Sequence, residues 1–187
     1  MTIRVDEDSK NGDFEAMALP HLDAAYNLAR WLSRNDYDAE DLVQAAYLRA
    51  FRFFEGFRGN DARAWLLTIV RNTYYTALRD NRHEHDAVPF DEDIHSPGGD
   101  DVDISVFGSG NNPEYIMASM DAKLAINQGL ASLPLSFREV VVLKDMDDLS
   151  YKQIAEICGI PIGTVMSRLA RGRKLLAVYL KQHGFGG

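Results

Sequence analysis

LSYKQIAEICGIPIGTVMSRLARGRKLL, residues 149–176, decides how the C-terminal part of this chain folds. Ser150 and Gln153 stand three residues apart at the head of an apolar run, the pattern of a capping box, so a helix is predicted to begin there. Gly159 supplies the left-handed residue that commonly ends a helix, and the chain restarts after Pro161. A short helix, a tight turn and a second helix form the helix-turn-helix pattern, whose second helix enters the major groove of DNA.

The second helix of this pattern, from about Ile162, separates into two faces when it is wound at 100° per residue. No acidic residue occurs from Ile157 to the C-terminus, although the whole chain has a net charge of −8. We therefore expect this helix to bind duplex DNA, and an ordinary amphipathic hairpin with a solvated basic face is the alternative. The apolar stripe contains Ile162, Val165, Leu169, Leu176 and Leu180, and the other face collects Thr164, Ser167, Arg168, Arg171 and Lys174.

The composition is that of a globular protein. A length of 187 residues suits one domain or two small ones. No apolar run approaches the roughly 18 residues of a membrane span, and the acidic N-terminus lacks the apolar region of a secretory signal. One cysteine excludes an internal disulfide and fits a reducing cytoplasm. We expect Cys158 to be a small core residue rather than a reactive thiol.

The N-terminal half has the apolar spacing of three helices. The first is expected over residues 19–33, with Pro20 in its first turn. Asp38 is predicted to cap the second, because Glu40 and Asp41 then occupy a first turn where the helix dipole favours negative charge. Its expected buried stripe is Val43, Ala46, Tyr47, Ala50, Phe54 and Phe57.

The third of these helices, from Asp61 to about Arg82, combines basic and aromatic side chains on one face. Arginines bind phosphates while a neighbouring ring stacks on an unpaired base, so this face suits single-stranded nucleic acid. For most of the phenylalanines nearby a core position is the better interpretation, whereas for Trp65 and Tyr75 both interpretations stay open. The expected core side is Leu66, Ile69, Val70, Thr73 and Ala77, and the other side holds Thr68, Arg71, Asn72, Tyr75, Arg79 and Arg82.

Residues 83–113 have no helical period, no basic residue and eight acidic ones, and they are predicted to be a flexible linker. Three histidines there could imitate a metal site, but their spacing does not support one. Asn112 and Pro113 then open a helix that Pro134 ends. The histidines are His83, His85 and His95, and the apolar positions of this helix are Ile116, Met117, Met120, Leu124, Ile126 and Leu130.

A second capping box, from Ser136 to Glu139, is predicted to open the helix that precedes the helix-turn-helix. The sequence therefore predicts an all-α protein of two small helical domains, residues 1–82 and 114–187, joined by the acidic linker 83–113.

Short segments in both helical regions match one protein family in the right order. They are DAEDLVQ (38–44) with Leu48 and Phe51, FRG (57–59), RAWL (63–66), IVRN (69–72), LP (133–134), FREV (137–140), LSY (149–151), IA (154–155), Gly159, GTV (163–165) and SRL (167–169). With them, over about residues 14–82 and 114–181, the chain resembles an extracytoplasmic-function sigma factor, a bacterial initiation factor that contains only sigma domains 2 and 4.

The resemblance implies that residues 1–82 are sigma domain 2 and residues 114–187 are sigma domain 4. It implies binding to core RNA polymerase at the β′ clamp helices and the β flap, binding to promoter DNA, and control by an anti-sigma factor. It implies no cofactor and no catalytic residue, and a cytoplasmic location. The implied contacts with core polymerase are Asp38, Asp41, Leu42, Gln44, Leu48 and Phe51. Those with the −10 element are Arg63, Trp65, Arg71, Asn72, Tyr75 and Arg79, and those with the −35 element are Lys152, Thr164, Ser167, Arg168, Arg171 and Lys174.

Three features depart from the family pattern: the end of the third helix is less basic than usual, the linker is long and acidic, and Gly172 interrupts the last helix at a cost of about 1 kcal/mol. An autonomous helix-turn-helix regulator would explain residues 149–176 but would leave the N-terminal motifs without a role. A sigma mimic that sequesters an anti-sigma factor, and an enzyme with a metal site in the linker, are the further alternatives.

Limited proteolysis tests this domain division. Because the linker has no apolar pattern with which to fold, the first cuts are expected between residues 83 and 112 and should release two stable helical fragments. Mass spectrometry locates the cuts, and circular dichroism of the fragments measures their helicity. First cuts inside either predicted domain would contradict the division.

Overall fold

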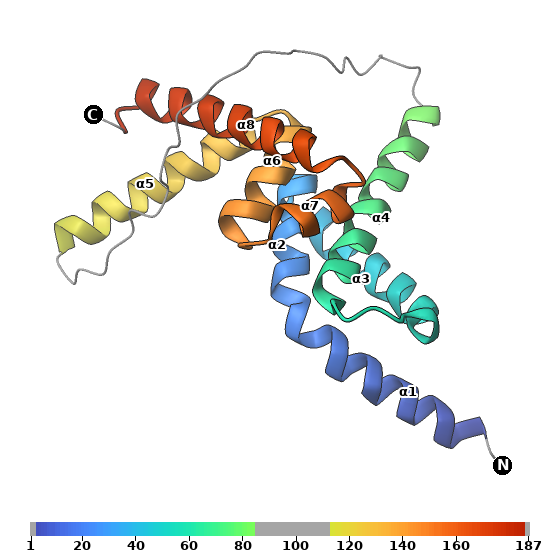
Figure 1. Ribbon diagram of the computed structural model, residues 1–187. Helices are drawn as coiled ribbons and strands as arrows, with labels where there is room; N and C mark the ends of the chain where they lie inside the picture. Colours follow the sequence, from blue (N-terminus) through green and yellow to red (C-terminus); the bar gives the residue numbers. More distant parts are fainter. Residues whose placement is uncertain (1–2, 85–112, 186–187) are drawn as a thin grey trace. The chain divides into compact units, whose positions relative to one another are not determined.

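The computed structural model describes residues 3–84 and 113–185 (Figure 1). Within these ranges the regular elements are helices and no strand occurs, which confirms the predicted all-α class. The chain divides into two compact units, which are described separately. Most of the predicted linker, with His85 and His95, lies outside the described residues, as does the segment where proteolysis is expected.

The first unit contains four long helices: α1 (Ile3–Ala18), α2 (Leu22–Ser33), α3 (Asp36–Phe53) and α4 (Ala62–Glu84). Short 3-10 turns, Leu19–His21 and Phe54–Gly56, follow α1 and α3, and Pro20 stands at the start of the first of them. Helices α2, α3 and α4 pack on one another around four deeply buried leucines, Leu28, Leu32, Leu66 and Leu67. Sequence periodicity placed Ala77 in this core, but Ala77 is exposed and Leu67 is buried.

The start of α3 differs from the prediction. Asn35, not Asp38, is the capping residue, and its side-chain oxygen accepts hydrogen bonds from the backbone N–H groups of Tyr37 (2.9 Å) and Asp38 (3.3 Å). The reason is that Arg34 takes the left-handed conformation, with φ 60°, at the end of α2. The chain therefore turns within two residues, and α3 begins earlier than its acidic first turn suggested.

Helix α1, which the sequence pattern did not predict, is held to the unit by Phe14. The ring of Phe14 is buried and lies edge-on to the rings of Phe51 (centroids 5.3 Å apart), Phe54 (5.5 Å) and Tyr47 (6.3 Å). The Tyr47 hydroxyl donates a hydrogen bond to the Ala18 carbonyl (3.0 Å), and burial, with a smaller effect of the nearby Asp23, raises the pKa of Tyr47 to about 12. Tyr47 and Phe51 of α3, and Phe54 of the 3-10 turn after it, are therefore partly buried and pack against the core.

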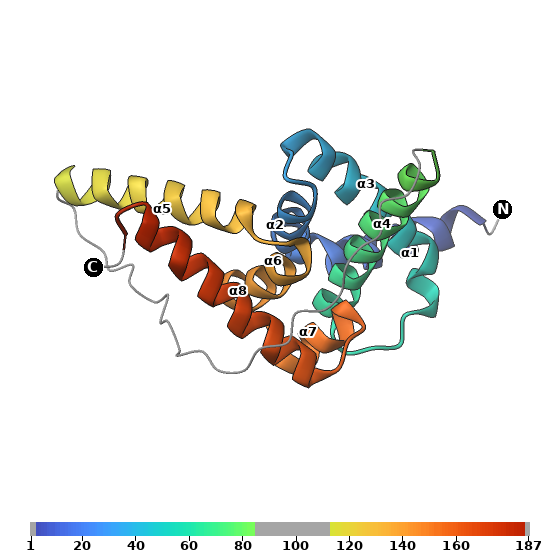
Figure 2. The ribbon, with the colours of Figure 1, turned by 90° about the horizontal axis from the view of Figure 1, so that it is seen from above.

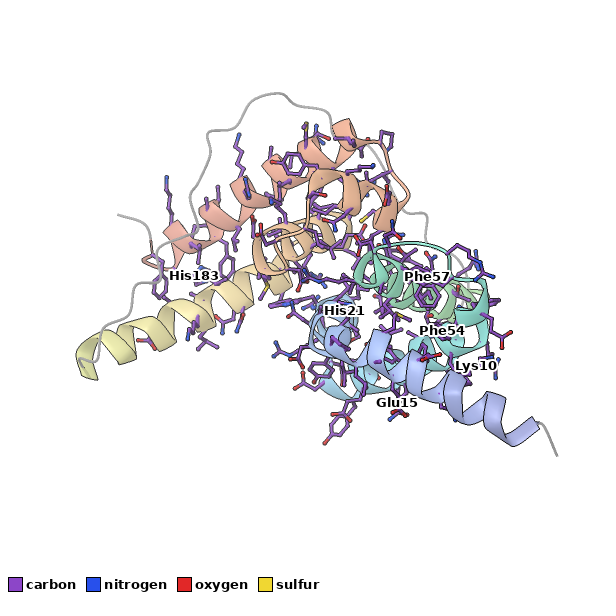
Figure 3. All side chains as sticks on the ribbon, turned by 60° about the horizontal axis from the view of Figure 1, so that its bottom comes forward. Lys10, Glu15, His21, Phe54, Phe57 and His183 are labelled. Atoms are coloured by element: carbon purple, nitrogen blue, oxygen red, sulfur yellow. The ribbon has the colours of Figure 1, made fainter. Side chains whose placement is uncertain are left out.

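An ion pair lies beside the aromatic contact between α1 and α3. The Lys10 ammonium lies 2.9 Å from the Glu55 carboxylate and 5.0 Å from the centre of the Phe51 ring, and its hydrogen bond and positive charge lower the pKa of Glu55. Figure 3 labels Lys10 on α1 and Phe54 just after α3.

The second unit contains α5 (Pro113–Ser132), α6 (Leu135–Val141), a π-helical turn (Val142–Met146), the first half of α7 (Tyr151–Cys158) and α8 (Ile162–Gln182). Helices α5 and α8 run side by side, as the two views of Figures 1 and 2 agree, and α6 packs on α8. Two expected core positions, Leu124 of α5 and Ile162 of α8, are instead exposed. Leu124 lies roughly opposite the buried side of α5, which contains Ala125, Gly129 and Leu130, whereas Ile162 stands at the edge of the buried face of α8.

The predicted capping box of α7 is confirmed in both directions. The Ser150 N–H donates to the Gln153 side-chain oxygen (2.9 Å), and the Gln153 N–H donates to the Ser150 hydroxyl oxygen (3.2 Å). Gly159 has φ +66° after α7, and α8 begins at Ile162 as expected. The helix-turn-helix is therefore formed locally as its sequence predicts, and Cys158 is buried.

The second predicted capping box is wrong. Helix α6 begins after Pro134 without a side-chain cap, and Glu139 is 1% exposed, with its carboxylate 3.9 Å from the guanidinium of Arg168. Arg138 instead satisfies the end of α5, since its guanidinium donates to the carbonyl oxygens of Leu130 (3.1 Å) and Leu133 (2.9 Å). The S-x-x-E spacing is shared by a cap and by this buried carboxylate, so sequence cannot separate them.

Gly172, which looks like a defect in the sequence of α8, lies where α6 meets that helix. It is buried, and a methyl group built on it would stand 2.7 Å from Val141 Cγ2 and 3.4 Å from both Cβ and the carbonyl oxygen of Phe137. The glycine lets the two helices approach closely, and this contact offsets its low helix propensity.

We predict that Gly172→Ala destabilises the protein. Overpacking costs about 1–3 kcal/mol and exceeds the gain of about 1 kcal/mol in helix propensity, so the net loss should be about 1 kcal/mol. Chemical unfolding of the full chain measures this loss.

Gly163→Ala is the matched control on the same helix, because no atom lies within 4 Å of its added methyl group. Its stability should be unchanged or higher. If Gly172→Ala also proved stabilising, the close contact would not constrain the packing of α6 on α8.

Candidate nucleic-acid interface

Helix α3 presents an exposed stripe on the side opposite its buried alanines. Asp41, Gln44 and Leu48 lie on it at helical spacing, and all three are exposed. Tyr37 extends the stripe toward the start of the helix and is 82% exposed. Tyr37 belongs to this helix because the cap lies at Asn35 rather than at the predicted Asp38.

Two residues of the expected polymerase-binding set lie off this stripe. Leu42 is only 8% exposed, because it stands one helical turn before Ala46 on the buried side. Phe51 packs against Phe14. Asp38 is exposed at the start of the helix. The accessible members of the predicted polymerase-binding set are therefore Asp38, Asp41, Gln44 and Leu48.

The start of α4 is fixed by a cap and an aromatic stack. The Asp61 carboxylate accepts a hydrogen bond from the Ala64 N–H (2.9 Å), and the Trp65 ring lies 4.6 Å from the Phe57 ring with 32° between their planes. A methyl group on Gly59 would stand 2.9 Å from the Phe57 ring, so this turn requires the small residue. Trp65 is half-buried, which leaves part of its ring accessible beside the stack.

Further along α4, basic and aromatic groups stand together as the sequence predicted. The Arg71 guanidinium lies over the Tyr75 ring, 4.4 Å from its centre, and the Tyr74 ring meets Tyr75 edge-on at 5.5 Å. Asn72 and Arg79 are exposed on the same helix, and Arg63 is half-buried near its start. A stacked guanidinium and ring offer a positive charge and an aromatic surface side by side.

The candidate residues of α8 fall into two groups. Arg168 is 18% exposed, and its guanidinium nitrogen lies 3.9 Å from the buried carboxylate of Glu139 on α6. Arg173, which is not among the predicted DNA contacts, binds Asp145 of the π-helical turn with two hydrogen bonds of 2.6 and 3.1 Å. These two arginines tie α8 to the elements before it.

The other candidates are more accessible. Lys152, Ser167 and Lys174 are exposed, and Thr164 and Arg171 are half-buried. Among the side chains of residues 10–81 and 121–185, none forms an ion pair with Arg171. The Ser167 hydroxyl donates a hydrogen bond to the Thr164 carbonyl of its own helix (3.1 Å). Arg171 therefore keeps its guanidinium available, whereas Arg168 is held against Glu139.

Among the described residues, no group of three or more histidine, cysteine or acidic side chains is arranged to hold a metal ion. A search of the same residues for a helix long and apolar enough to span a membrane finds none.

Comparison with known proteins gives this arrangement a context. Residues 17–84 match the family model of sigma-70 region 2, and residues 123–176 match that of sigma-70 region 4. The chain is 35% identical over 171 residues to the ECF RNA polymerase sigma factor SigE of Mycolicibacterium smegmatis, a match that covers 91% of this chain and 62% of that one. It is 31% identical to the ECF RNA polymerase sigma factor SigW of Bacillus subtilis, with 92% of each chain covered.

A solved structure has the same fold. The sigma factor RpoE of Bartonella quintana, crystallised with the anti-sigma factor NepR, has a TM-score of 0.66 and 31% identity to this chain, with 90% of this chain and 97% of that one covered. The fold and the two matched regions define a sigma factor of the sigma-70 type. Within that class, the chain belongs to the family of ECF RNA polymerase sigma factors, and the resemblance seen in the sequence is confirmed.

The two arginines of α8 should respond differently to truncation. Arg171→Ala should cost about 1–3 kcal/mol of DNA binding at one −35 position and relax the base preference there, as expected for loss of a bidentate contact with guanine. Arg168→Ala leaves the buried Glu139 carboxylate without this cation, so it should lower the thermal stability and weaken all −35 sequences alike. Thermal melts and binding to a panel of −35 variants measure both effects.

Lys174→Ala is the control for a phosphate contact: it should weaken all sequences evenly and reduce the salt slope of binding by about one unit. The assignment is overturned if Arg168→Ala melts like the parent protein and loses its preference at a single base pair.

Proposed function

We propose that this chain is a cytoplasmic initiation factor that directs bacterial RNA polymerase to particular promoters. The observation that supports the proposal best is that one chain carries both sigma-70 regions in order, with exposed residues at helical spacing on α3, α4 and α8. Each of these helices uses one face for the core of its unit and leaves another face for a partner.

The α3 stripe suits a protein partner. Asp41, Gln44 and Leu48 combine a charge, an amide and an apolar side chain, and Tyr37 adds an exposed aromatic ring at one end. Protein interfaces are dominated by a few such aromatic and apolar anchors within a polar rim. We assign this stripe to core polymerase at the β′ clamp helices, and the β flap is assigned to the second unit.

The α4 face suits the opened −10 element. A flipped base is captured by stacking on a ring while cations neutralise the flanking phosphates. Trp65 beside Phe57, and Tyr75 under Arg71, supply such ring surfaces, and Asn72 and Arg79 add polar groups on the same helix. Both rings are held by neighbouring side chains of the same unit, which favours a surface with fixed ring positions.

The α8 face suits the duplex −35 element. This helix is the second of the helix-turn-helix, and residues 157–187 contain no acidic side chain that would repel phosphates. In this proposal α8 recognises duplex DNA, whereas α4 recognises strands that have been separated.

An anti-sigma factor is the proposed regulator. The Bartonella relative, which matches most of this chain, was crystallised with one. An autonomous helix-turn-helix regulator remains the competing proposal, but it gives no role to the α3 stripe or to the aromatic pairs of α4.

Run-off transcription with core polymerase from the source organism tests the proposal. Adding this protein should yield transcripts from a subset of the organism's promoters, and core polymerase alone should yield none from them. A protein that binds those promoters without supporting transcription would instead be an autonomous regulator.

The double variant Asp38→Lys, Asp41→Lys should weaken binding to core polymerase and leave the helical content unchanged, because both carboxylates are exposed. Fluorescence titration with core polymerase measures the affinity. The double variant Asp13→Lys, Asp23→Lys, on α1 and α2, is a control of the same charge change at two exposed carboxylates, and it should have a smaller effect. Equal affinities for the parent and the double variant would remove α3 from the interface.

A further inference from the structure

Two apolar side chains are exposed at the start of α8, where a recognition helix meets base edges. Ile162 is 44% exposed and Met166, one helical turn later, is 49% exposed. The buried stripe of the same helix runs through Val165, Leu169 and Leu176, so Ile162 and Met166 are not needed for the core.

The polar neighbours of these two residues already have partners or are short. Arg168 is held by Glu139, and the Ser167 hydroxyl donates to the Thr164 carbonyl. The neighbouring exposed residues Gly163 and Ala170 have little or no side chain. Ile162 and Met166 are therefore the large exposed apolar side chains of the first two turns of α8.

The chemistry of the major groove gives such atoms one matching partner. A thymine presents a C5-methyl group there, whereas the other base edges present hydrogen-bond donors and acceptors that an apolar side chain would leave unsatisfied. An exposed methionine also adapts its shape to a neighbouring apolar group, because its side chain is unbranched and polarizable.

We propose that Met166, with Ile162 beside it, reads thymine methyl groups in the −35 element, so that the base preference at these positions comes from apolar contact rather than from hydrogen bonds. This inference rests on the proposed function, which places α8 in the major groove. It assigns the first two turns of α8 to thymine and leaves Arg171, further along, as the residue for guanine.

Single exposed apolar residues are common on protein surfaces and by themselves indicate nothing. Leu175 and Val178 of α8 are also exposed, but they lie about 20 Å or more from the helix start at 1.5 Å per residue, beyond the residues that reach base edges. What distinguishes Ile162 and Met166 is their position at the helix start, among short or already bonded polar neighbours.

Replacing thymine by uracil tests the inference, because it removes only the methyl group. A promoter is first selected by in vitro transcription from a library randomised across the −35 element, with the full chain and core polymerase. Each −35 thymine is then replaced by deoxyuridine, and holoenzyme binding is measured for the parent protein, Met166→Ala, Ile162→Ala and the control Val178→Ala, which truncates an exposed apolar residue of the same helix.

The parent protein should bind about fourfold more weakly when one of the −35 thymines becomes uracil, as expected for loss of one buried carbon group. Met166→Ala should bind the thymine and uracil forms equally at that position, and Val178→Ala should keep the difference. Met166→Gln, which keeps the length and the helix propensity, should also lose the difference, so a folding defect of the alanine variant does not decide the result.

The inference is overturned if the selected −35 element contains no thymine, if no uracil substitution weakens the parent protein, or if both Met166 variants keep the full methyl preference. Failure of the proposed function would look different, because the full chain and core polymerase would then select no promoter from the library.

Discussion

The packing of α6 on α8 constrains the whole second unit. Helix α8 must bury one stripe and still present a face to a partner, and the glycine at position 172 lets it approach Val141 closely enough to do so. The Glu139–Arg168 pair lies at the same interface and fixes the rotation of α8 about its axis. Rotating α8 about its axis by the equivalent of one residue, about 100°, would turn Arg171 and Met166 away from their present directions. This interface therefore determines which side chains of α8 face a partner.

The first unit solves the same problem with aromatic residues. Phe14 of α1 inserts among Tyr47, Phe51 and Phe54, so the last turns of α3 are covered on one side while Leu48 stays exposed on the other. On α4 the Phe57–Trp65 stack and the Arg71–Tyr75 pair hold large side chains in place at the surface. Rings that are already positioned lose little conformational freedom when they bind, which favours affinity for a partner.

Some basic residues of α8 form ion pairs within the protein and others remain available to a partner, and the net charge of the chain does not distinguish the two groups. The chain is acidic overall, yet residues 157–187 are free of acidic side chains. Two of the arginines there, Arg168 and Arg173, are bound to carboxylates of preceding elements, and Arg171 is left toward the partner face. Counting basic residues along α8 therefore overestimates how many are available to DNA.

The sequence by itself determined the helical class, the helix-turn-helix and its capping box, and the family. The helices and the capping box depend on spacing of three or four residues within one helix, and the family depends on short segments that occur in a fixed order, so both can be recognised without a fold. The cap of α3 at Asn35 was missed, because an earlier cap requires Arg34 to adopt a left-handed conformation that few non-glycine residues take.

Only the tertiary structure decided which polar residues of a helix face are bound within the protein and which apolar residues are exposed. The sequence pattern treats Arg168 and Arg171 alike, and the difference comes from Glu139, which is 29 residues before Arg168 in the chain. In the same way, Ile162 fits the apolar stripe by spacing but is 44% exposed. Packing between distant segments assigns these roles, and a periodicity measured along one helix carries no information about what lies opposite.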